Sequence, residues 1–323
     1  MGITGDSVVL EKETKAYIGD GAAVTSGGDI SVDADAETDI IQVALSINGG
    51  LVGVTGAAGV VVAKNKTQAT IGDNVFAYAT DSMRLEAKDD TEIDAIVLAG
   101  AGGAVGVSGA FGTYVFKSTT EAKIGDDATI MALASGSGMD AASGEIDNST
   151  TSVTSKTTRN QDGDETEDNF TVVNASFDKD TIKGLSIAAL TNEDVNFAPV
   201  GLGFGAVGVA GVVATTVANS TTRAQIGSNT TINNDLSVAS SDQDVRMLAR
   251  SNTLLNNISS GISAGGVAVS LDIDTKVFTK TVEAIVGDNV TMNANQNVTI
   301  EADTTDRIYQ TMVSVAGGVN AVG

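Results

Sequence analysis

The amino-acid sequence repeats itself, and this repeat constrains the possible folds more than any other feature. The tag Ala-x-Ile-Gly-Asp begins at Ala16, Ala69 and Ala122, and variants of it begin at Ala224 and Ala284. The glycines of successive tags are 53, 53, 102 and 60 residues apart. The period is therefore 53 residues, with about 49 extra residues in the third interval and 7 in the fourth.

Residues outside the tag keep the same register. Val52, Val105, Val207 and Val267 occupy one repeat position. The columns divide the chain into units at about 3–55, 56–108, 109–210, 211–270 and 271–323. The third unit contains a polar, acidic insertion at about 133–195. Because the first and last units are cut at the same repeat position, we expect the chain to be a segment of a longer array.

Each unit has the alternation of a β-strand with one buried face. Ile30, Val32 and Ala34 alternate with polar residues, and Asn48-Gly49-Gly50 then supplies a turn that tolerates positive φ. The return run, 51–63, is small or apolar on both faces, so we expect it to be covered on both sides.

A unit of this kind cannot bury its apolar face alone, and stacking on its neighbours solves the problem. The sequence therefore predicts an all-β fold, an elongated β-solenoid (a β-helix or β-roll) with Gly-rich hairpins. Only one proline, Pro199, interrupts it, as expected where backbone amides are needed for sheet pairing.

The uncharged run 197–218 is long enough to suggest a transmembrane helix as one interpretation. It is interrupted by five glycines, is rich in valine, and occupies the hairpin position of the other units. We therefore interpret it as a buried hairpin and expect a chain that does not span a membrane.

Composition excludes several classes of function. With 18 basic and 41 acidic residues the formal net charge is −23, which argues against nucleic acid and anionic membranes as partners. The chain has no Cys, His or Trp, so it has no disulfide, no thiol nucleophile and no imidazole base. The acidic residues occur in every repeat, and we expect them to discourage sideways association of long rods.

Calcium is the one metal that the oxygen-rich sequence suggests. The aspartates of the Gly-Asp turns form one column, although Asp also simply favours turns. A denser cluster in the insertion comprises Asp162, Asp164, Glu165, Glu167 and Asp168. Thr158 stands where a calcium loop would place its first acidic ligand, and a solvated acidic loop is the alternative interpretation.

Catalysis has little support in the sequence. Acidic pairs such as Asp89 with Asp90, or Asp242 with Asp244, are abundant, and none stands out from the rest. Without Trp and with few arginines, the chain offers no sugar-binding platform. We expect a protein that is not an enzyme and has no obligatory cofactor.

The pattern Thr-x-Ala-x-Ile-Gly-Asp, then Ile-x-Val-x-Ala, then a Gly-Val-rich hairpin resembles the repeats of filamentous-haemagglutinin-like adhesins. These are two-partner-secreted surface proteins of Gram-negative bacteria, and they include the leukotoxin-type filamentous adhesins. The resemblance covers the chain apart from the insertion. It implies a secreted β-helical stalk displayed at the cell surface, attached to the outer membrane, with roles in cell adhesion and virulence.

Three functions remain as hypotheses. The first is a non-catalytic stalk of an extracellular adhesin fibre, with the insertion as the contact surface for a host or bacterial receptor or glycan. The second is a subunit that stacks head to tail with copies of itself into a filament, since strand edges template further strands. The third is a polysaccharide-processing β-helix enzyme.

Overall fold

The computed structural model describes residues 1–159 and 165–322 and shows an all-β protein. Seven long strands form one parallel sheet: β1 (Gly2–Ile18), β3 (Ile30–Ile71), β5 (Met83–Ile124), β9 (Gly184–Phe204), β10 (Val207–Ile226), β12 (Asp244–Val286) and β14 (Val298–Val322). Five short strands form a second sheet: β2 (Ala23–Ser26), β4 (Phe76–Ala79), β6 (Thr129–Ala132), β11 (Thr231–Ile232) and β13 (Thr291–Met292). The remaining elements are a 3-10 turn, η1 (Leu236–Val238), and an antiparallel pair, β7 (Met139–Arg159) and β8 (Glu165–Ile182).

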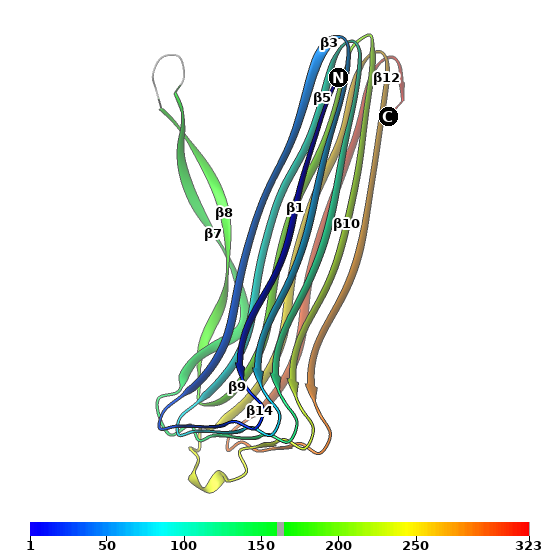
Figure 1. Cartoon of the computed structure of the whole chain (residues 1–323). Helices are drawn as coiled ribbons and strands as arrows, with labels where there is room; N and C mark the ends of the chain where they lie inside the picture. Colours follow the sequence, from blue (N-terminus) through cyan, green and yellow to red (C-terminus); the bar gives the residue numbers. More distant parts are fainter. Residues whose placement is uncertain (160–164, 323) are drawn as a thin grey trace.

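The long strands fold back on themselves, so that the large sheet forms two layers (Figure 1). In β3, residues 30–48 run away from the short strands, the chain reverses at Gly49-Gly50, and residues 51–71 return. We call the two layers outgoing and returning, and we call the ends near the short strands and near the reversal proximal and distal. Gly50 and Gly103 have φ of 151° and 155°, and a methyl group on Gly103 would lie 1.8 Å from the Gly50 carbonyl oxygen. The predicted glycine turn is therefore present, and its glycines are required by close approach of neighbouring turns.

Successive units pair in the register of the sequence repeat. Ile71 of β3 is opposite Ile124 of β5, which is opposite Ile226 of β10, which is opposite Val286 of β12. These offsets of 53, 102 and 60 residues equal the spacings between the tag glycines. Like residues therefore stack on like residues along the direction in which the units follow one another.

The interior changes character along the strands. A proximal core lies between the two layers and the short strands, and it includes Leu85, Ile124 and Ile187, all with 0% exposure. Toward the distal end the layers approach closely, and many of the interior residues are small. A methyl group on Gly106 would lie 2.4 Å from the carbonyl oxygen of Phe204, and Gln42 Nε2 donates a hydrogen bond across the layers to the Val60 carbonyl.

The return run is covered on one side only, which corrects the prediction from its two apolar faces. Ala57, Val61 and Ala63 face the interior and are buried, whereas Val52 on the outer face is 59% exposed. The outer positions of neighbouring strands are also open, with Phe111 of β5 54% exposed. Alternation identified the residues that share a face, but no layer formed by the described part of the chain packs on the second apolar face.

The uncharged run 197–218 forms parts of β9 and β10, with the reversal between them, as the hairpin interpretation predicts. None of the helical segments in the described residues is sufficiently long and apolar to cross a membrane.

The predicted insertion divides into two parts. Residues 139–182 leave the layers as the β7–β8 hairpin, which diverges from the outgoing layer in Figure 1. Residues 184–195 belong instead to β9, which lies between β5 and β12. The stack therefore continues without interruption behind the hairpin.

Candidate functional site

The aspartates of the Gly-Asp turns join one repeat unit to the next. Asp20 accepts a hydrogen bond from the backbone N–H of Asp73 at 2.9 Å, and Asp73 accepts one from Asp126 at 2.9 Å. The tag glycine makes room for this contact, since a methyl group on Gly72 would lie 2.3 Å from Oδ1 of Asp20. These contacts favour the structural interpretation of this column over the calcium interpretation.

The acidic cluster of the insertion is only partly described. Asp162 and Asp164 lie outside the described residues. Glu165, Glu167 and Asp168 begin β8, where their backbones pair with β7, and their side chains lie outside the described part. Calcium binding there stays a prediction. Among the residues that can be described, no group of three or more acidic side chains is placed to hold a metal ion.

The foot of the hairpin is fixed to the outer face of the outgoing layer by several side chains of the sheet, including Arg84, which donates to the Asp140 carbonyl. Arg246 donates to the Ala142 carbonyl at 2.9 Å and to Asp180 at 2.7 Å, and Arg250 donates to the Gly144 carbonyl at 2.7 Å. Glu86 accepts from the Ala142 N–H at 2.7 Å. Burial raises the pKa of Glu86, while that N–H and the guanidinium of Arg84 oppose the increase.

A polar crevice of about 310 Å³ opens where the hairpin leaves the sheet. Its walls come from Gly144 and Glu145 of β7 and from outward residues of β12 and β14, including Arg250, Asp303 and Arg307. Both signs of charge line it. Arg250 both forms a wall of this crevice and holds the foot of the hairpin, so the crevice and the hairpin foot form one continuous surface.

An acidic strip lies on the same outer face, farther toward the distal end. Register places Asp39, Glu92 and Asp194 side by side on β3, β5 and β9. Burial together with Asp94, Asp194, Asp39 and Asp90 raises the pKa of Glu92 to about 7. The strip concentrates negative charge beside the crevice, so this face favours cationic over anionic groups.

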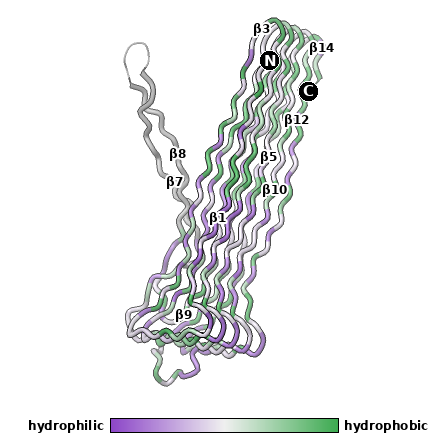
Figure 2. Tube along the Cα trace, in the orientation of Figure 1, coloured by the Kyte–Doolittle hydropathy of each residue, from purple (hydrophilic) through white to green (hydrophobic). Residues whose placement is uncertain are grey.

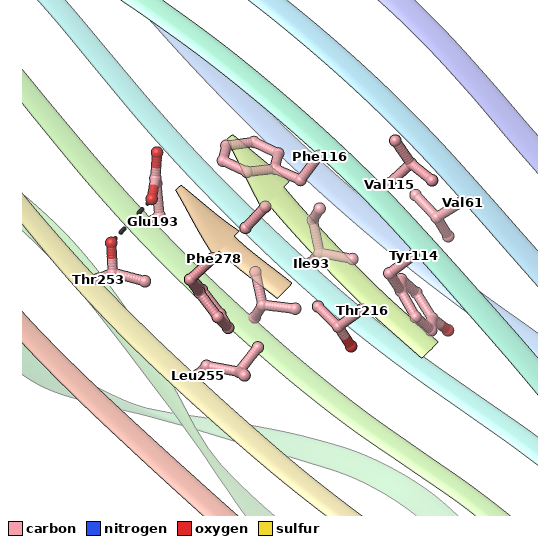
Figure 3. A pocket seen from close by; sticks show the side chains of 12 residues that line it. Val61, Ile93, Tyr114, Val115, Phe116, Glu193, Thr216, Thr253, Leu255 and Phe278 are labelled. Carbon is pink, nitrogen blue, oxygen red and sulfur yellow. Dashed lines mark hydrogen bonds between the residues drawn. The ribbon is translucent and has the colours of Figure 1, made fainter. Parts of the chain in front are cut away.

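A polar belt also crosses the interior, between the proximal core and a second core nearer the distal end. Asn65 donates to Thr91 at 2.8 Å, and Thr67 donates to Asp89 at 3.0 Å. Glu193 accepts from Thr253 at 2.8 Å (Figure 3), and among the described residues its other carboxylate oxygen finds no hydrogen-bond partner.

Glu193 borders a cavity of about 10 Å³ that Ile93, Phe116 and Phe278 close on other sides, as Figure 3 shows. Burial raises the pKa of Glu193, and the ammonium of Lys280 opposes the increase. The space is about that of one water molecule, so the cavity suits hydration of the carboxylate and not a substrate.

The acidic pairs named from sequence do not converge. Asp89 points inward and Asp90 outward, because successive residues of a strand face opposite sides. Asp242 pairs with Lys183 at 3.2 Å, whereas Asp244 accepts from the Asn297 N–H at 2.9 Å. Sequence spacing did not identify Glu86, Arg246 and Arg250 as the anchors of the hairpin, since only the fold brings them to it.

Comparisons with protein-family models, curated proteins and solved structures give no match.

Proposed function

We propose that this chain is a non-catalytic segment of a large extracellular bacterial surface fibre or adhesin, built as a β-solenoid. The observation that carries the proposal is the in-register pairing of successive units, from which a single hairpin diverges. Units that pair in parallel with one another extend in one direction as more are added. Such a stack is suited to separating a binding element from a cell, and the resemblance of its repeats to filamentous-haemagglutinin-like adhesins agrees with this role.

The contact surface in this proposal is the hairpin with the crevice and the acidic strip at its foot. The partner is a receptor or glycan on a host or bacterial surface. The arginine contacts at the hairpin foot support this assignment, because they hold the protruding strands at a defined place on the stack.

The proposal is tested by replacing residues 140–181 with a short turn, which the pairing of Met139 with Ile182 permits. We expect the shortened chain to keep the circular dichroism of the β-sheet and to lose binding to a panel of mammalian cells, bacterial cells and arrayed glycans. Retained binding after hairpin removal would contradict the assignment of the contact surface. No binding of the full chain to any of these surfaces would contradict the adhesin role.

Head-to-tail self-assembly is a second candidate, favoured by the outermost strands. In the described part of the chain, β1 pairs only with β3, and β14 pairs only with β12. Edges of this kind can add a further strand. Electron microscopy at rising protein concentration separates the candidates: rods that lengthen support assembly, and short rods of constant length exclude it.

A further inference from the structure

The distal part of the returning layer presents a flat apolar surface to solvent. It consists of the outward-facing residues of 52–62 in β3, 105–115 in β5, 207–217 in β10, 267–277 in β12 and 3–9 in β1. We call it the apolar return face. All of these residues are described, and none of the side chains on the face is charged. Phe111 is 54% exposed, Leu271 58% and Ile273 46%.

The β-propensity of valine and isoleucine does not account for this surface, because the same strands continue proximally with a different outer face. Lys64 and Lys66 follow Val62 on β3, and Lys117 follows Val115 on β5. Pairing and register are the same on both sides of this boundary. Figure 2 shows hydrophilic segments gathered between the middle of the strands and the base. The apolar residues are therefore a property of the distal outer surface.

We propose that the apolar return face binds the same face of a second copy of this chain, with the distal ends of the two copies overlapping and pointing in opposite directions. Five strands and eleven residue positions give a face of about 850 Å². A stable protein interface of standard size buries about 800 Å² on each partner. The face alone is thus large enough for a dimer.

The opposing orientation follows from where the charges lie. It overlaps the uncharged distal parts and places the charged proximal parts at opposite ends of the dimer. The proximal returning layer carries Lys15 and Lys66 beside Glu13, and the more acidic outgoing layer faces away from the contact. The net charge of −23 therefore opposes this association less than its size suggests, since charges beyond about 8 Å are screened at physiological salt.

The apolar return face has hollows and protrusions that a second copy of the same face would also present. Gly56 and Gly211 open hollows, because a methyl group added to either would meet nothing closer than 3.9 Å. Phe111 and Leu271 protrude from neighbouring positions. A two-fold contact places the same set of protrusions and hollows on both sides of the interface.

A lipid bilayer fits this surface less well. Asp274 and Lys276 form an ion pair inside the layers, and register places Asp274 level with Ala214, in the distal part. At the same level the edge strand β1 has backbone groups paired on one side only. Each unpaired backbone group costs several kcal/mol in hydrocarbon, whereas water at the rim of a dimer satisfies it.

The test is sedimentation velocity of the full chain over a range of concentrations, with two matched variants. Phe111→Glu and Ile96→Glu change residues of the same strand that are 54% and 49% exposed on opposite layers. We expect wild type to dimerise, Phe111→Glu to weaken the dimer by about 100-fold or more, and Ile96→Glu to leave it unchanged. Thr275→Lys, on the same face in β12, provides a second variant should Phe111→Glu alter folding by circular dichroism.

Three results would overturn the proposal. A wild-type chain that stays monomeric at every concentration excludes the dimer. Equal weakening of the dimer by Phe111→Glu and Ile96→Glu would show that the apolar return face is not the specific contact between the copies. Flotation of a monomeric chain with zwitterionic phosphatidylcholine vesicles, lost in Phe111→Glu, assigns the face to a bilayer. The proposal does not depend on the adhesin role, because dimerisation is measured without any receptor.

Discussion

The proximal and distal halves of the layered stack are made from the same strands, yet they place their large apolar side chains on opposite sides. Proximally, residues such as Ile124 are enclosed and charged residues such as Lys66 point outward. Toward the distal end, many of the residues between the layers are small, such as Ala99 and Ala110, and residues such as Ile41 point outward with 79% exposure. Strand alternation is therefore kept along the whole length, but the outward-facing positions carry charged residues proximally and large apolar residues distally.

The cause of the difference is the distance between the layers. The short strands hold the layers apart at the base, which leaves room for a core. The reversal at the distal end joins them by a tight turn, and backbone comes within reach of backbone. The buried residues of the two cores therefore determine stability, and the distal outer residues are left exposed for association.

The largest expected effect is the loss of stability when a buried proximal isoleucine is replaced by alanine, compared with the same change at an exposed distal isoleucine. Ile124→Ala should lower the free energy of unfolding by about 2–5 kcal/mol, because it leaves a cavity in a closed core. Ile41→Ala should change it by only about 0.5 kcal/mol, because the side chain is mostly in water. Urea unfolding followed by circular dichroism measures both. Equal losses would show that the distal outer face is covered within one copy.

A smaller loss of stability should follow from replacing the tag glycine, which is required only where the preceding repeat unit packs against it. Gly72→Ala pushes a methyl group to 2.8 Å from the backbone nitrogen of Asp20, so we expect a loss of about 1–3 kcal/mol. Gly19→Ala occupies the same tag position in the first unit and meets nothing within 4 Å. Its unfolding midpoint should stay close to that of wild type. An equal loss of stability in Gly19→Ala would mean that intrinsic backbone preference, and not contact with the preceding unit, accounts for glycine at this position.

The smallest expected effect concerns pH and the acidic strip. The pKa of Glu92 is raised from 4.5 to about 7 in the folded chain, so between these values the folded state binds more protons than the unfolded state. The stabilising contribution is present at low pH and is lost as pH rises toward 7. Melting temperature should therefore be higher at pH 5.5 than at pH 7.5.

Glu92→Gln provides the matched test of that slope. It should raise the melting temperature at pH 7.5 and reduce the difference between the two pH values. Glu121→Gln, on the returning layer of the same strand, should leave the difference as in wild type. If melting temperature depends on pH in Glu92→Gln as it does in wild type, the acidic strip is not the source of that dependence.

Much of the fold follows from the sequence, because repetition and alternation are local in origin. The 53-residue spacing predicts which residues stack, and Gly49-Gly50 predicts the reversal. The sequence does not specify which face of a strand acquires a neighbour, so the outer face of 51–63 was predicted to be covered. The site is less predictable still: Arg246 reaches Ala142 only because β9 pairs with both β5 and β12, which brings β12 beside the hairpin that follows β5.

The most direct test of the division into a stabilising half and an associating half is cross-linking of single cysteines, since the natural chain has none. Thr113→Cys lies near the centre of the apolar return face, and Lys123→Cys lies on the same strand and layer about 33 Å nearer the base. With a short bismaleimide, Thr113→Cys should be captured as a dimer and Lys123→Cys should remain a monomer. Capture of both variants to the same extent, or of Lys123→Cys alone, would contradict the account.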